Sequence, residues 1–129
     1  MFRDLQNIFR KTIGLKDAIA EGLKSIVEDI DYAFIYGSFA SGDFKAESDV
    51  DLLLIGDVSS RKLSNVLLEV GETIEREVNY SIFKQNEFTE RLRTRDHFIS
   101  RIIATPMLFI IGDSNEFRSM AEKWMAQGP

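Results

Sequence analysis

The sequence lacks cysteine and contains only two prolines, one tryptophan and one histidine among its 129 residues. Without cysteine there is no disulfide framework and no thiolate site for zinc or iron–sulfur, which favours a cytoplasmic location. No apolar run approaches the ~18 residues that would span a bilayer, and the N-terminus has no uninterrupted apolar stretch typical of a signal peptide. The net charge of −5 argues against broad, non-specific DNA binding, which requires a basic face. We therefore expect a cytoplasmic protein that binds neither membranes nor bulk DNA.

The sequence does contain enough apolar residues for a folded core. Hydrophobic residues make up 44% of the chain and charged residues 29%, a balance that excludes intrinsic disorder. Roughly 100–150 residues is the commonest size of a domain. We expect a single domain over residues 1–129, with N-terminal helices in 1–29, a core in 30–112 and a C-terminal helix in 113–129.

The hydrophobic pattern predicts both helices and strands. Strands are expected at 32–36, 50–55, 77–83 and 107–111, of which 50–55 is apolar enough to be covered on both faces. Helices are expected at 4–13, 16–28, 60–74, 86–92, 96–104 and from 113 onward, with Ser60, Asn86 and either Asp113 or Ser114 as N-caps. This order predicts an α+β fold, a mixed sheet of about four strands with helices packed mainly on one side.

One stretch carries candidate chemistry. Gly37-Ser38 ends a predicted strand, ten residues follow, and Asp49-Val50-Asp51 opens the next strand. Side chains alternate along a strand, so Asp49 and Asp51 point to the same face. Two close carboxylates raise each other's pKa unless a cation lies between them, and Mg²⁺ prefers oxygen ligands of this kind. Gly37 has no Cβ, so a phosphate can approach the backbone closely, and the Ser38 hydroxyl is a hydrogen-bond donor.

These residues resemble the minimal nucleotidyltransferases of the DNA polymerase β superfamily, whose mark is Gly-Ser, a loop and then Asp-x-Asp. The resemblance covers about residues 30–112 and implies the nucleotidyltransferase fold. The sequence is similar in particular to a branch of this superfamily in which such a domain follows a winged-helix DNA-binding domain. The segments that resemble this branch are 9–15, 76–79 and 109–113.

The resemblance implies transfer of a nucleoside monophosphate from a nucleoside triphosphate, with ATP the first choice, to a hydroxyl of a protein, an RNA or a small molecule. Asp49 and Asp51 would hold two Mg²⁺ ions, or Mn²⁺ in their place, and would be the catalytic residues. Gly37 and Ser38 would contact the β- and γ-phosphates. Related minimal domains pair with a helical companion in toxin–antitoxin systems, so a partner protein, as acceptor or as DNA-binding companion, is also implied.

Two departures from the family pattern leave alternatives open. The position of the family's third carboxylate corresponds to Asn79, with Glu77 two residues earlier on the same strand face as a possible substitute ligand. Asparagine cannot act as a base. Phe39 follows Ser38 where Arg is common, and Lys45 is the nearest phosphate-binding replacement. The alternative function is therefore a catalytically weakened nucleotide-binding or regulatory module.

Other features fit more than one role. The arginines between residues 91 and 101 fit either a solvated helix face or a cradle for a triphosphate tail or RNA. His97 is expected at the start of a helix, in a capping or surface role, with a catalytic base as the alternative. The apolar stripe within residues 2–13 fits either a cap on the sheet or the contact of a homodimer.

Overall fold

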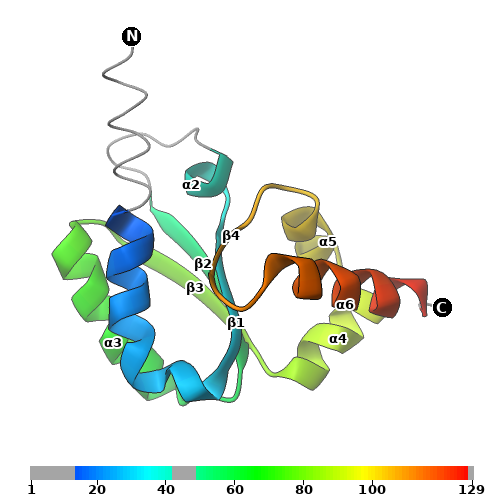
Figure 1. Cartoon of the computed structure of the whole chain (residues 1–129), viewed down its shortest axis with the longest axis horizontal. Helices are drawn as coiled ribbons and strands as arrows, with labels where there is room; N and C mark the ends of the chain where they lie inside the picture. The colour runs from blue at the N-terminus through cyan, green and yellow to red at the C-terminus, as the bar shows by residue number, and fades with distance from the viewer. Residues whose placement is uncertain (1–13, 42–48, 128–129) are drawn as a thin grey trace, which may run out of the picture.

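The computed structural model describes residues 14–41 and 49–127 (Figure 1). Its centre is a four-stranded mixed sheet in the order β3-β2-β1-β4. The strands are β1 (Ile30–Tyr36), β2 (Val50–Gly56), β3 (Val78–Phe83) and β4 (Leu108–Ile111). β1 pairs antiparallel with both β2 and β4, whereas β2 and β3 are parallel. A parallel pair needs a crossover connection, which α3 (Ser60–Ile74) supplies. The predicted α+β fold and four-stranded mixed sheet are confirmed.

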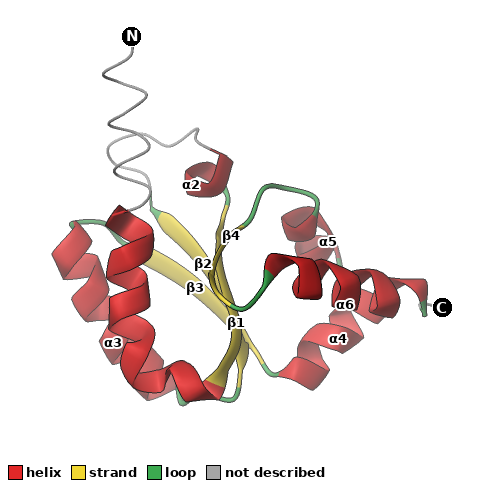
Figure 2. Ribbon diagram, viewed as in Figure 1, coloured by secondary structure: helices red, strands yellow, loops and turns green. Residues whose placement is uncertain are grey.

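Helices cover both faces of this sheet, and the expectation that they pack mainly on one side was wrong (Figures 1 and 2). The helix over residues 14–23, its 3₁₀ continuation η1 (Lys24–Asp29) and α3 lie on one face. On the other face lie α4 (Gln85–Arg93), α5 (His97–Ile103) and α6 (Ser114–Ala126). The reason is that the two central strands are apolar on both sides, so each face needs its own cover.

Each face has a separate hydrophobic core. The first contains Leu52 and Leu54 of β2 together with Leu23 and Leu63 from the helices. The second is largely aromatic, since the fully buried rings of Phe34, Phe88 and Phe117 meet at centroid distances of 5.2 and 5.8 Å around Phe117. Each buried phenylalanine stabilises the fold by about 1.5–3 kcal/mol. These rings fix α4 and α6 against the sheet.

Local capping explains where the helices begin. The N-cap of α3 is Ser59 rather than the predicted Ser60, and its hydroxyl accepts the Lys62 N–H at 3.4 Å. Helix α4 begins at Gln85, before the predicted cap Asn86, and the Glu87 carboxylate accepts the Lys84 N–H at 3.1 Å. The prediction for α6 is confirmed, because the Asp113 carboxylate accepts the N–H groups of Asn115 and Glu116 at 2.7 and 3.3 Å.

Some predictions fall outside the described residues. They are the helix at 4–13 with its dimer or capping stripe, and the loop residue Lys45. The helix predicted at 16–28 already exists at residue 14 and changes to 3₁₀ geometry after residue 23. Within the described ranges, no helix is both long and apolar enough to cross a bilayer.

Candidate active site

Strand register brings the two aspartates together with residues from both neighbouring strands. Asp51 of β2 pairs with Tyr36 of β1 on one side and with Asn79 of β3 on the other. Asp49 lies just before β2, and its Oδ2 accepts a hydrogen bond of 3.2 Å from the Asn79 amide. Asp51 alternates with Leu53, which lies in the aromatic core, so the acids are on the face covered by α4, α5 and α6.

The environment opposes the charged form of Asp51. Burial is the main cause that raises the pKa of the Asp51 carboxyl, and the charge of Asp49 raises it further, while a hydrogen bond from Asn79 partly offsets both. The pKa of the Tyr36 phenol is also raised, first by burial and then by the charge of Asp51, against a hydrogen bond with Ser81. Asp51 therefore lies in a partly desolvated setting beside the exposed, negatively charged Asp49, where a bound cation would relieve the repulsion.

Two features favour glycine at position 37, namely its backbone conformation and the close approach of the Asp51 carboxylate. Its φ is +77°, in the left-handed region that glycine adopts at little cost. A Cβ at this position would lie 2.8 Å from Oδ2 of Asp51. Ser38 then opens the short helix α2 (Ser38–Ser41), in which the Ser41 hydroxyl donates to the Ser38 carbonyl at 3.2 Å. The predicted Gly-Ser turn thus lies directly against the predicted carboxylate pair.

The donor set fits a magnesium ion. In proteins Mg²⁺ is commonly held by one or two carboxylates, with substrate phosphates and water completing the shell. Asp49, Asp51 and the side-chain carbonyl of Asn79 offer oxygen ligands of this kind. Among the described residues, no three or more His, Cys, Asp or Glu are arranged so that they could hold a metal ion together, so these two carboxylates are not joined by a third.

Of the two candidates for the third ligand, the structure places Asn79 beside the acids. Glu77 precedes β3, where its carbonyl accepts the Val50 N–H at 2.9 Å. The same residue lines a hollow of about 380 Å³ between α3 and β3, on the opposite side of the sheet. No hydrogen bond between the Glu77 side chain and either aspartate occurs in the described part of the chain.

A second hollow, of about 540 Å³, opens beside Gly37 between the end of β1 and α5. Its aromatic wall includes Tyr36 and Phe98, whose rings meet edge to face with centroids 6.3 Å apart. Sequence reasoning did not identify Tyr36 or Phe98 as site residues, although the position of Tyr36 directly before Gly-Ser was a usable signal. The full lining is Tyr36, Gly37, His97, Phe98, Arg101, Ile102 and Thr105.

Comparison with known proteins assigns the family. Residues 17–113 match the family described as "Polymerase beta, Nucleotidyltransferase", and the chain belongs to this family. No curated protein matches the chain significantly.

The fold is also found in solved structures. One similar chain comes from a crystal structure of a toxin–antitoxin with AMP-PNP, at 13% identity and a TM-score of 0.62, covering 86% of this chain and 84% of that one. Another comes from a structure of the tri-AMPylated Shewanella oneidensis HEPN toxin in complex with MNT antitoxin, at 10% identity, TM-score 0.59 and coverage of 89% of this chain and 84% of that one. A third comes from the toxin–antitoxin MntA-HepT, at 11% identity, TM-score 0.56 and coverage of 87% and 82%. At these identities the likeness shows a shared nucleotidyltransferase fold.

Proposed function

We propose that this protein is a Mg²⁺-dependent nucleotidyltransferase that transfers AMP from ATP to a hydroxyl group on a partner protein. The observation that carries the proposal is the position of Asp49 and Asp51, which share the Asn79 amide while Asp51 lies against Gly37. A metal–triphosphate complex can bind where a pair of carboxylates holds the metal and faces a turn. The backbone of that turn must be open enough for the phosphates to approach it. The family match supports the reaction class.

Each site residue has a defined part in this reaction. Asp49 and Asp51 would hold the metal, and Asn79 orients the Asp49 carboxylate through its 3.2 Å hydrogen bond. A bound divalent ion would act as a Lewis acid that offsets the charge developing on the phosphate oxygens. Gly37 leaves room for the triphosphate beside Asp51, and the Ser38 hydroxyl donates to it.

The transfer of AMP needs no cofactor other than the metal ion, because every bond formed or broken belongs to ATP or to the acceptor. The acceptor oxygen forms a bond to the α-phosphorus, the bond from that phosphorus to the bridging oxygen breaks, and pyrophosphate leaves. The acceptor proton passes to water, because Asn79 cannot take it. The protein mainly positions the two reactants and fixes the charges around them.

The acceptor and the biological setting are proposed from the structural neighbours. One neighbour belongs to a complex of a tri-AMPylated toxin with its antitoxin, and another to a toxin–antitoxin with the ATP analogue AMP-PNP. We propose that the chain acts likewise within a toxin–antitoxin or regulatory pair, with ATP as donor and a companion protein as acceptor. Mn²⁺ is expected to replace Mg²⁺, since both accept oxygen ligands.

Label transfer tests the proposal. The chain is incubated with Mg²⁺, the protein encoded by the adjacent gene, and ATP labelled either at the α- or at the γ-phosphate. We expect the α-label, and not the γ-label, to appear on the companion protein. Asp49→Asn and Asp51→Asn should abolish labelling, whereas Asp57→Asn, an exposed aspartate just after β2, should retain it. Labelling that survives both active-site substitutions would contradict the proposal.

A second candidate function is a nucleotide-binding regulatory module without transfer activity. The observation that favours it is Asn79 itself, which pairs with Asp51 where the family resemblance places a third carboxylate. Such a module would bind Mg²⁺ and ATP through Asp49 and Asp51 but would label no acceptor with any of the four nucleoside triphosphates. Binding without labelling therefore separates the two functions.

A further inference from the structure

The hollow beside Gly37 has a basic residue on its far wall. His97, Arg101 and Thr105 recur at intervals of four along α5 and its end, and all three line this hollow. Residues four apart lie on the same face of a helix. The face of α5 that looks toward the Gly-Ser turn therefore presents a guanidinium group across a space that Gly37 itself borders.

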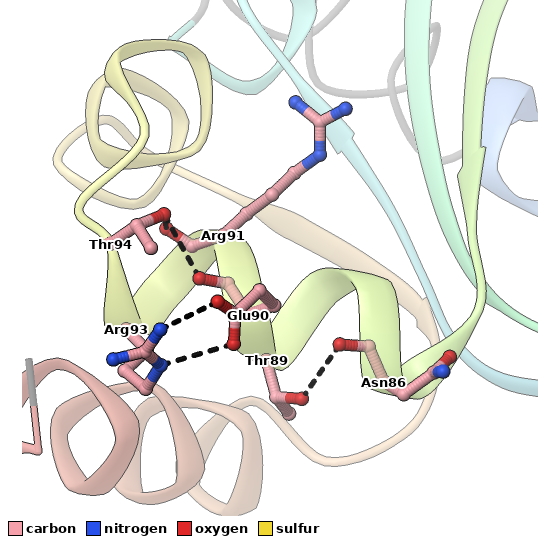
Figure 3. A network of polar contacts seen from close by, with 6 residues as sticks. All are labelled: Asn86, Thr89, Glu90, Arg91, Arg93 and Thr94. Atoms are coloured by element: carbon pink, nitrogen blue, oxygen red, sulfur yellow. Dashed lines mark hydrogen bonds and ion pairs between the residues drawn. The ribbon is translucent and has the colours of Figure 1, made fainter.

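Two of the neighbouring arginines, Arg91 and Arg93, are already engaged, and Arg95 lies outside the hollow. The Arg93 guanidinium makes two hydrogen bonds to the Glu90 carboxylate, at 2.6 and 3.0 Å (Figure 3). Arg91 extends away from that pair in Figure 3; it lies 4.9 Å from the centre of the Phe83 ring and 3.5 Å from the Asp96 carboxylate. By contrast, within the described ranges the exposed Arg101 side chain makes no ion pair or hydrogen bond. Arg101 is thus the arginine of this cluster that is both available and aimed at a cavity.

We infer that Arg101 is a phosphate-binding residue and that the hollow between β1 and α5 receives the nucleotide. This inference rests on the proposed function and names the side chain that completes its site. The described residues of the Gly-Ser turn, 37–41, include no lysine or arginine, and Arg101 supplies the positive charge that these residues lack. A guanidinium group can donate hydrogen bonds to two phosphate oxygens at once, whereas the ammonium group of lysine acts as a point charge.

The size and lining of the hollow agree with a nucleotide. Small-molecule sites usually enclose about 300–1,000 Å³, with apolar walls and a few convergent polar groups. This hollow has about 540 Å³, an apolar side from Tyr36, Phe98 and Ile102, and polar groups that include Arg101 and Thr105. Phe98 is 41% exposed, which leaves ring surface on which a base can stack.

Calorimetry with ATP and Mg²⁺ tests the role of Arg101 on the full chain. Arg101→Ala should weaken ATP binding about tenfold or more, the loss expected for a charge-assisted hydrogen bond. Arg101→Lys, which keeps the charge without the guanidinium group, should lose less. Arg95→Ala removes an equal charge from an exposed site outside the hollow and should bind ATP within about twofold of the unaltered chain.

Thermal melting with and without ATP separates a role of Arg101 in binding from a role in stability. Without ATP, Arg101→Ala should melt at the temperature of the unaltered chain, because the side chain is exposed and unpaired in the described structure. With ATP and Mg²⁺, the stabilisation of the unaltered chain should be largely lost in the variant, since ligand stabilisation follows affinity.

The outcomes separate this inference from the proposed function. ATP binding that survives Arg101→Ala but is lost in Asp51→Asn would overturn the role of Arg101 and leave the proposed function standing. Equal losses in Arg101→Ala and Arg95→Ala would overturn the inference as a general charge effect. A chain that fails to bind ATP at all would overturn both. Selective loss in Arg101→Ala without any label transfer would support the inference and favour the regulatory module.

Discussion

Replacing Gly37 with alanine tests how closely the phosphate turn and the carboxylate pair depend on each other. The backbone of Gly37 has φ +77°, a conformation that costs an L-residue about 1–2 kcal/mol. The added Cβ would also lie 2.8 Å from Oδ2 of Asp51, so the carboxylate must shift. We expect Gly37→Ala to lower the melting temperature by roughly 3–12 °C and to weaken ATP binding in the presence of Mg²⁺.

Two other glycines provide controls for this experiment. Gly112 has φ +94°, and its added Cβ would lie 2.5 Å from the Tyr32 ring, near the opposite end of β1. Gly112→Ala should therefore lower the melting temperature but leave ATP affinity intact. A Cβ on Gly14 meets no atom within 4 Å, so Gly14→Ala should not destabilise the chain. Unchanged melting temperature and unchanged calorimetric affinity in Gly37→Ala would show that the turn and the Asp51 carboxylate do not depend on each other.

Three further predictions concern the acids and the core. Burial and the charge of Asp49 raise the pKa of Asp51, so the folded chain binds a proton at the Asp51 carboxyl more tightly than the unfolded chain does. The free energy of unfolding therefore falls as the pH rises from the ordinary pKa of aspartate through the raised pKa of the folded chain. Asp51→Asn should thus raise the melting temperature at pH 7 without metal, and the gain should shrink below pH 4; a lower melting temperature at pH 7 would contradict this. Asn79→Asp replaces the donor 3.2 Å from Asp49 with a third negative charge, and should cost up to about 1 kcal/mol that Mg²⁺ restores in thermal melts; a cost that Mg²⁺ leaves unchanged would argue against a metal site here. Phe117→Ala removes the ring shared by Phe34 and Phe88 and should cost about 3–5 kcal/mol in urea unfolding, whereas a loss below about 1 kcal/mol would show that α6 is not fixed by this core.

The local part of the site could be predicted from the sequence because it depends on short-range rules. The alternation of β2 places Asp49 and Asp51 on one face, and the adjacent strand β1 ends at Gly37. The structure agrees with both placements, although the chemical roles of these residues stay proposals. Position 79 could also be predicted from the sequence. Strand β3 pairs with β2 in parallel, and the register places Asn79 opposite Asp51.

The long-range part could not be predicted because no periodicity encodes it. Arg101 and Tyr36 are far apart in sequence, and they line one hollow because β4, directly after α5, pairs with β1. The helices on both faces follow from apolar positions on each side of the central strands. The sequence shows this pattern at 50–55, where every residue from Leu52 to Ile55 is buried.

The most direct test of the proposed metal and nucleotide site is diffraction from crystals of the full chain grown with Mn²⁺ and a non-hydrolysable ATP analogue. Manganese takes the same oxygen ligands as magnesium and is located by its anomalous signal. We expect manganese bound at about 2.0–2.3 Å from the carboxylates of Asp49 and Asp51, with the triphosphate of the analogue over Gly37 and Ser38. Nucleotide bound elsewhere on the chain, with no metal between these two aspartates, would contradict the proposed site.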